Sequence, residues 1–177
     1  MKCTKTFLSI LLTTLSFSLQ GQDFEQLILG AWQEEKVTSV LICEGRIYNG
    51  IIPEISFDGL GFIYFFRENG LLELDSRISD ELSSGTYRIE DRQLSRSVDG
   101  LEFQDTIQQI NSQWLVTESR VTGGPFSAQE MGDLRQMRKE RTITAKGMRL
   151  VKRLVGKEIT ISYTTYFRRV DTPEENR

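Results

Sequence analysis

The sequence predicts an all-β domain, an antiparallel up-and-down barrel of about eight strands. The first observation is a set of dipeptides that tolerate positive φ angles and are typical of tight turns: Asn49-Gly50, Asp58-Gly59, Asn69-Gly70 and Asp99-Gly100. The second is that apolar and polar residues alternate between these turns, as they do in strands with one buried face. A two-sheet sandwich has the same turn spacing, so the sequence leaves that architecture open as an alternative.

The alternation is clearest in two segments, residues 101–108 and residues 159–168. Gly156-Lys157, just before the second segment, fits a two-residue turn between strands. Asp105 shares a predicted strand face with Phe103 and Ile107. We expect Asp105 to lie where the strand bends into solvent, because carboxylates are rarely buried. A functional polar group is the other interpretation.

Residues 1–21 have the three regions of a cleavable secretory signal peptide. Lys2 and Lys5 precede an apolar run, Phe7–Phe17, and small residues follow that allow cleavage after Ser18 or Gly21. The run is too short to cross a bilayer, which takes about 20 apolar residues. A buried N-terminal helix or an uncleaved anchor fits the charge asymmetry less well. We therefore expect an exported protein, periplasmic or secreted, with one domain at 22–177.

Cleavage would change both the charge and the cysteine content. The full chain has 22 basic and 25 acidic residues, and cleavage removes two lysines and no acid. Cys43 would be the only cysteine left, so no intramolecular disulfide could form. We expect its thiol to be buried, as small apolar sulfur groups usually are; a thiol that forms a dimer is the alternative.

Two short helical patterns interrupt the strands. Asp23 can cap a helix that carries Phe24, Leu27 and Ile28 on one face. Residues 121–142 are predicted to be an insertion before the last strands, because they contain a capping-box pattern at 127–130. An ordered helix and a mobile loop are both open for this insertion.

The start of the predicted barrel resembles a known family. Gly30 and Trp32, directly after the short helix, resemble the Gly-x-Trp signature of lipocalin-like domains. Glycine lets the chain bend at the barrel base, and the indole can fill the closed end. Residues 66–70, 85–89 and 166–170 resemble strands of the exported bacterial lipocalin-like domain family. The resemblance implies an arginine packed over the tryptophan; strand parity favours Arg169 over Arg168 for this cation–π contact.

Such barrels imply a cavity for a small, mostly apolar ligand. The candidate wall residues are the aromatic ones of the predicted strands and turns: Phe57, Phe62, Tyr64, Phe66, Tyr87, Phe103, Trp114 and Tyr163. The alternative is that these rings simply fill the barrel, since side chains can fill an eight-stranded interior.

The composition argues against catalysis. The chain has no histidine, which removes the common triads, histidine zinc sites and the commonest general base. No phosphate-binding glycine loop or calcium loop occurs. We therefore expect no enzyme activity, no metal and no cofactor.

Residues 134–157 contain nine basic residues and one acidic residue. Residues 22–133, in contrast, contain eight basic and 20 acidic residues. The ordinary interpretation is that basic late strands pair beside acidic ones. The functional interpretation is that the basic residues bind an anionic surface partner.

Export and net negative charge argue against nucleic acid as a partner, and no stable membrane insertion is expected after cleavage. Two hypotheses follow: an exported binding module for a small apolar or amphipathic ligand, or a non-enzymatic interaction protein whose filled barrel docks on an envelope or cell-surface partner.

Overall fold

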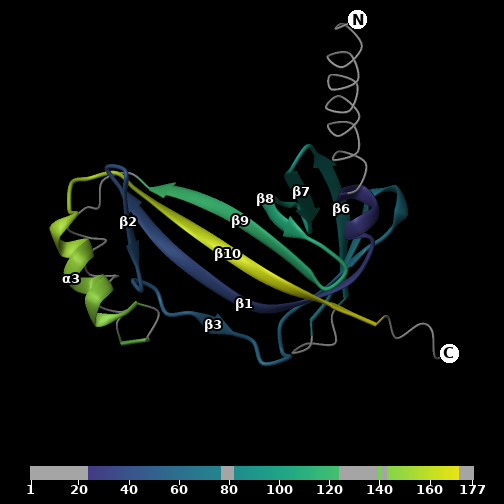
Figure 1. Ribbon diagram of the computed structural model, residues 1–177, viewed down its shortest axis with the longest axis horizontal. Helices are drawn as coiled ribbons and strands as arrows, with labels where there is room; N and C mark the ends of the chain where they lie inside the picture. The colour runs from purple at the N-terminus through teal and green to yellow at the C-terminus, as the bar shows by residue number, and fades with distance from the viewer. Residues whose placement is uncertain (1–23, 77–81, 124–138, 141–142, 172–177) are drawn as a thin grey trace, which may run out of the picture.

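The computed structural model describes residues 24–76, 82–123, 139–140 and 143–171, which form a closed antiparallel barrel of eight strands (Figure 1). Pairing follows the order β10-β9-β8-β7-β6-β5-β4-β1, and a β1–β10 ladder closes the ring. This closure confirms the barrel and excludes a sandwich. The strands are β1 Gly30–Cys43, β2 Arg46–Asn49, β3 Ile55–Ser56, β4 Ile63–Phe66, β5 Leu71–Asp75, β6 Leu82–Glu90, β7 Gln93–Val98, β8 Leu101–Ile110, β9 Trp114–Gly123 and β10 Ile159–Val170.

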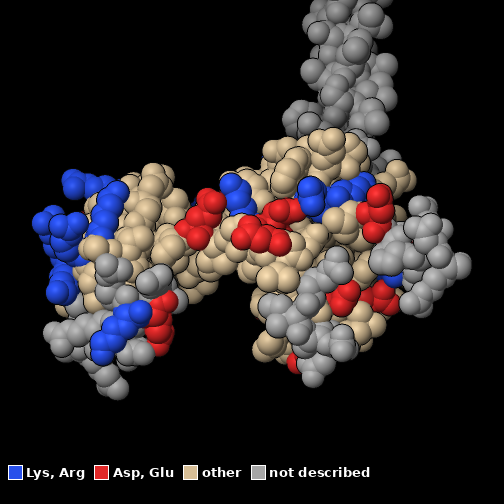
Figure 2. Space-filling view, turned by 90° about the horizontal axis from the view of Figure 1, so that it is seen from below, with Lys and Arg blue, Asp and Glu red and all other residues tan. Residues whose placement is uncertain are grey.

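The structure has two lobes because β1, β9 and β10 continue beyond the barrel. The first residues of β1, Gly30–Gln33, pair with β4, whereas its last residues, Val40–Cys43, pair with β2. Helix α3, Ala145–Arg153, lies at the far end of these long strands (Figure 1). A narrower waist separates this second lobe from the barrel (Figure 2).

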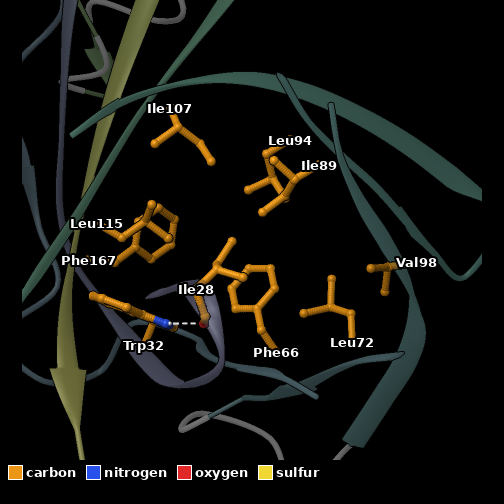
Figure 3. Packing of buried hydrophobic residues seen from close by; sticks show 10 residues of the cluster. All are labelled: Ile28, Trp32, Phe66, Leu72, Ile89, Leu94, Val98, Ile107, Leu115 and Phe167. Carbon is orange, nitrogen blue, oxygen red and sulfur yellow. Dashed lines mark hydrogen bonds between the residues drawn. The ribbon is translucent and has the colours of Figure 1, made fainter. Parts of the chain in front are cut away.

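The barrel core is packed solidly at one end, where helical residues 24–28 lie (Figure 3). The Nε1–H of Trp32 donates a hydrogen bond of 2.6 Å to the carbonyl oxygen of Ile28, which joins the helix to the first strand. Burial of apolar clusters such as this one is the dominant favourable term in folding. Its buried members are Ile28, Trp32, Phe66, Leu72, Ile89, Leu94, Val98, Ile107, Leu115 and Phe167.

The Gly-x-Trp sequence and Arg169 meet at this closed end. The guanidinium of Arg169 lies 4.9 Å from the centroid of the Trp32 ring and donates to the carbonyl oxygen of Leu29. Gly30 has a φ of +117°, and a Cβ there would lie 2.9 Å from the Arg169 guanidinium. Position 30 therefore requires glycine for its backbone angle and for the space that Arg169 occupies.

The turns agree only partly with the prediction. Asp99-Gly100 has positive φ at both residues and joins β7 to β8, as expected. Asn69-Gly70 likewise lies between β4 and β5, in the short 3₁₀ turn η1, Glu68–Gly70. Asp58-Gly59 forms no hairpin, because β3 and β4 both pair with β1. Three turns between paired strands were not predicted: Glu44-Gly45, Asp91-Arg92 and the β8–β9 turn at 111–114.

The prediction of basic late strands was wrong, since residues 145–153 form helix α3. Gly156-Lys157 consequently follows a helix and is not a hairpin turn. The Thr144 hydroxyl caps α3 by accepting from the Gly147 N–H at 2.9 Å. The apolar side of the helix covers a second core: Leu41, Cys43, Ile51, Ile143, Val151, Leu154 and Ile159. Cys43 is buried there, as expected.

Several predictions concern residues outside the described ranges. The signal peptide at 1–21 and the cap at Asp23 lie there, and so does most of the 121–142 insertion. Residues 121–123 belong to β9, so any insertion begins after them. None of the helices in the described part of the chain is long and apolar enough to span a bilayer.

The closed-end core gives a direct stability prediction. Ile107→Ala should lower the free energy of unfolding by about 2–5 kcal/mol, because the side chain is fully buried and leaves a cavity. Ile47→Ala on β2, where the side chain is 64% exposed, is the matched control and should change it by less than about 0.5 kcal/mol. Urea denaturation measures both, and equal effects would contradict this description of the core.

Candidate functional site

A cavity of about 270 Å³ lies at the barrel mouth, opposite the closed end. The direction follows from β4: Phe66 packs in the core beside Ile28, whereas Tyr64 and Phe62 are successive inward residues toward the other end. The turn between β7 and β8 borders the mouth. The lining residues are Phe62, Tyr64, Leu74, Ser83, Arg96, Val98, Asp99, Leu101 and Phe103.

The rim of this mouth pocket is apolar and unusually exposed. Phe62, Leu101 and Phe103 are 44%, 63% and 46% exposed. Single exposed apolar residues are ordinary, but three around one opening form a patch of the kind that marks binding surfaces. The Phe62 and Tyr64 rings are in edge contact, with centroids 6.5 Å apart. The rim is therefore suited to an apolar or aromatic group.

The floor of the pocket is formed by a buried ion pair, Arg96 with Asp105. The exposed side-chain fractions are only 12% and 6%. The guanidinium also lies 5.3 Å from the Tyr64 ring centroid and 5.6 Å from that of Phe103. These rings and the Asp105 carboxylate hold the cation in place below the rim.

One donor on this floor is unused. Arg96 Nε is buried and has no hydrogen-bond partner among the described residues. Burying a donor without a partner is costly, so such atoms in native proteins call for an explanation. Other atoms of the same side chain line the pocket, so the Arg96 guanidinium borders the space that a bound molecule would occupy.

Burial also perturbs two acids at this level of the barrel. Burial raises the pKa of Glu34, and this rise is partly opposed by the Arg96 cation and by the Phe62 backbone N–H. The pKa of Tyr64 is raised, first by burial and then by the charge of Glu34. Arg96 therefore lies near two carboxyl groups, Asp105 paired with it and Glu34 farther away.

The expectation that Asp105 reaches solvent was wrong, since Asp105 is 5% exposed. Sequence reasoning also missed Arg96, although a signal was present. Arg96 lies between Leu94 and Val98 at strand spacing, so parity alone points its side chain inward. Two inward charges of opposite sign on predicted neighbouring strands indicate a buried pair.

The aromatic candidates separate into three groups. Phe62, Tyr64 and Phe103 line the mouth pocket. Phe66 is buried in the core, and Tyr87 packs on it at 4.9 Å between ring centroids. The remaining three lie outside the pocket: Phe57 between β3 and β4, Trp114 at the start of β9, and Tyr163 on β10 opposite Ser39 and Ser119. The structure thus brings only three of these rings together at one opening.

A second cleft, of about 430 Å³, lies outside the closed end and is lined by residues including Glu25, Glu68 and Arg88. Ile28 and Trp32 are fully buried between this cleft and the barrel interior, and they separate the two spaces. Among its described lining residues there is one aromatic ring, Tyr87, and no buried ion pair. In the described part of the chain, no group of carboxylate, cysteine or histidine side chains is placed to hold a metal.

The buried ion pair predicts a strongly non-additive mutant cycle. Arg96→Met should lower the free energy of unfolding by about 3–5 kcal/mol, because it leaves the Asp105 carboxylate buried without its partner. The double variant with Asp105→Leu should recover most of that loss. The same cycle on the exposed pair Arg88–Glu90 should couple by less than about 1 kcal/mol. Additive losses at Arg96 and Asp105 in urea denaturation would contradict the pairing.

Glu34 predicts a defined pH dependence. Since its pKa is raised in the folded state, the folded protein loses stability as pH rises through the ordinary value of 4.5 to the raised value. Glu34→Gln lacks this loss. The difference between its thermal unfolding temperature and that of wild type should therefore increase in favour of the variant as the pH is raised from about 4 to about 7. Glu102→Gln, an exposed site on β8, controls for removal of one carboxylate. An advantage that shrinks with pH would have the wrong sign.

Comparisons with known proteins add no family. No protein-family model matches the chain, and no curated protein matches it. Among solved structures, the chain is similar to a polyisoprenoid-binding domain from Saccharophagus degradans, with a TM-score of 0.32 and 7% sequence identity. That alignment covers 80% of this chain and 99% of the other. A similarity this distant contributes nothing to the choice of a ligand, so we infer the ligand class from the pocket alone.

Proposed function

We propose that this chain is an exported, non-catalytic binding module that holds a small amphipathic molecule at the barrel mouth. One observation carries the proposal: an exposed apolar rim surrounds a buried guanidinium that has an unused donor. The apolar part of the ligand contacts Phe62, Leu101 and Phe103. Its polar group faces inward and accepts from Arg96.

The charges on the floor favour a neutral polar group on the ligand. Asp105 already compensates the charge of Arg96, and Glu34 lies near the same cation. A carboxylate ligand would be repelled by both acids at close range, where the low dielectric strengthens charge interactions. A carbonyl or hydroxyl oxygen can accept a hydrogen bond from the Arg96 guanidinium without that cost.

The size of the pocket limits how much of a ligand it can enclose. Its 270 Å³ lies just below the range of about 300–1,000 Å³ that is usual for small-molecule sites. The core beneath Tyr64 and Arg96 is filled, so a ligand cannot extend toward the closed end. The site therefore takes either a small molecule or one end of a longer one whose remainder leaves through the mouth.

Export is supported by the sequence of residues 1–21, with its lysines, short apolar run and small residues. An exported barrel would meet its ligand in the periplasm or outside the cell. The second candidate function is an interaction protein that uses the barrel as a scaffold. The solid half of the barrel favours it, because only the mouth is left for a ligand.

The first test is displacement of N-phenyl-1-naphthylamine, a neutral fluorescent probe of apolar sites, by decanol and by decanoate. Decanol should displace the probe more effectively at neutral pH, because its head group carries no charge. Leu101→Ala should weaken binding about tenfold. Leu71→Ala is the matched control, since Leu71 is 43% exposed but lies outside the pocket.

Asp105→Asn tests the role of charge in the same assay. Removing the carboxylate leaves the Arg96 cation uncompensated. The affinity of decanoate relative to that of decanol, measured by displacement of the probe, should therefore rise about tenfold. Near-ultraviolet circular dichroism confirms that the variant is folded. Equal displacement by decanol and decanoate in wild type would exclude the neutral head group. Equal effects of Leu101→Ala and Leu71→Ala would exclude the mouth pocket itself.

Native mass spectrometry of protein purified from its own host then identifies the occupant. A retained small molecule supports the binding module, and the same spectra give the N-terminus, expected at Leu19 or Gln22. A bare mass, together with no probe binding, would favour the interaction protein.

A further inference from the structure

The outer side of α3 is exclusively cationic. Four of its nine residues are basic and exposed, and none is acidic. We call this surface the basic face; it consists of Lys146, Arg149, Lys152 and Arg153. Figure 2 shows lysine and arginine side chains gathered over the outer end of the second lobe, away from the barrel.

Helix stability does not account for this pattern. Lys152 and Arg153, in the last turn, are favoured by the helix dipole, but Lys146 lies in the first turn, at the positive end, and Arg149 lies at the middle of the helix, where the dipole gives little benefit. Like charges three and four residues apart, such as Arg149 with Lys152 and Arg153, destabilise a helix. No carboxylate among the described residues lies within ion-pair distance of the Arg149, Lys152 or Arg153 side chain.

The surroundings of α3 add to the imbalance. Described residues 44–49, 139–140 and 143–158 contain seven cations and three carboxylates, although the whole chain has a net charge of −3. One of these carboxylates, Glu44, is paired with Lys157 at 2.8 Å. The positive charge is therefore concentrated on one lobe, where it generates a local positive potential.

The basic face is held in a fixed position. The opposite side of α3 packs into the second core through Val151, and Leu154 follows at the C-cap. Gly147 lies so close to the chain that a Cβ would be 2.4 Å from the carbonyl oxygen of Ile51. Lys146 Nζ donates to the Asn49 carbonyl oxygen at 3.0 Å. The cations are thus presented together on a rigid surface, which reduces the entropic cost of binding.

We propose that the basic face docks on a bilayer that contains anionic phospholipids. A flat, extended anionic surface can contact all four side chains at once, and each lysine or arginine near such a surface adds to the attraction. The two cavities described above both lie in the barrel lobe, away from the basic face. Val155, 47% exposed just beyond the helix, offers an apolar side chain to the interface. The proposal does not depend on ligand binding at the barrel mouth.

The test is co-sedimentation of the full protein, purified from an exporting host, with two kinds of vesicle. Binding should be strong to phosphatidylcholine vesicles that contain phosphatidylglycerol and weak to pure phosphatidylcholine. It should fall sharply at about 0.5 M salt, because exposed charges are then screened. Mass spectrometry records the N-terminus, so that any retained apolar segment is the same in every variant compared.

Charge variants identify the surface. Arg149→Gln with Arg153→Gln should weaken binding about 30-fold, whereas the two Arg→Lys changes should leave it within about threefold. The matched control is Arg88→Gln with Arg168→Gln, two exposed arginines of the barrel lobe, which should have little effect.

Three outcomes would overturn the proposal. Equal binding to both kinds of vesicle would exclude an electrostatic role for the lipid. Equal losses in the α3 variant and the barrel control would exclude the basic face. Salt-sensitive binding to heparin beads, but to neither kind of vesicle, would identify an acidic polysaccharide as the partner.

Discussion

The antiparallel ladder between β1 and β10 is the constraint on which both lobes depend. It pairs Ala31 with Val170 at the closed end of the barrel and continues to Ile42 and Thr160 beneath α3. The same backbone hydrogen bonds close the ring, place Arg169 over Trp32 and provide the sheet on which the helix packs. A register slip of one residue would turn each of these side chains to the wrong face. The irregularity between Glu34 and Lys36 shows where the ladder adjusts between the two lobes.

The barrel interior is divided by polarity along its axis. Apolar residues fill the closed half, and the Arg96–Asp105 pair crosses the interior below the mouth. A buried ion pair contributes little net stability, because the desolvation of both charges offsets their attraction. Its structural effect is to prevent apolar side chains from filling the last layer of the barrel. The apolar rim therefore surrounds a shallow pocket and does not lead to a deep cavity.

The architecture could be predicted because it depends on local patterns. Asp99-Gly100 marks its hairpin by backbone angles alone, and Gly30 with Trp32 marks the barrel start by steric requirements that a sequence displays. The site was harder to predict because it depends on pairing. Arg96 and Asp105 are ordinary polar residues until two neighbouring strands bring them together inside a closed ring. Helix α3 was not predicted because four of its nine residues are basic, which left only a weak apolar periodicity in the sequence. Its buried side rests mainly on Val151 and on Leu154 at the C-cap.

Strand β2 has a consequence for self-association. Barrel closure gives each of the eight ring strands two neighbours, whereas β2 ends the order of the described strands and has a partner only on its β1 side. An unpaired edge is a template for edge-to-edge aggregation. Here the edge is only four residues long and begins with Arg46. Its shortness and its charge limit intermolecular strand addition, so the second lobe extends from the barrel without presenting a long uncharged edge.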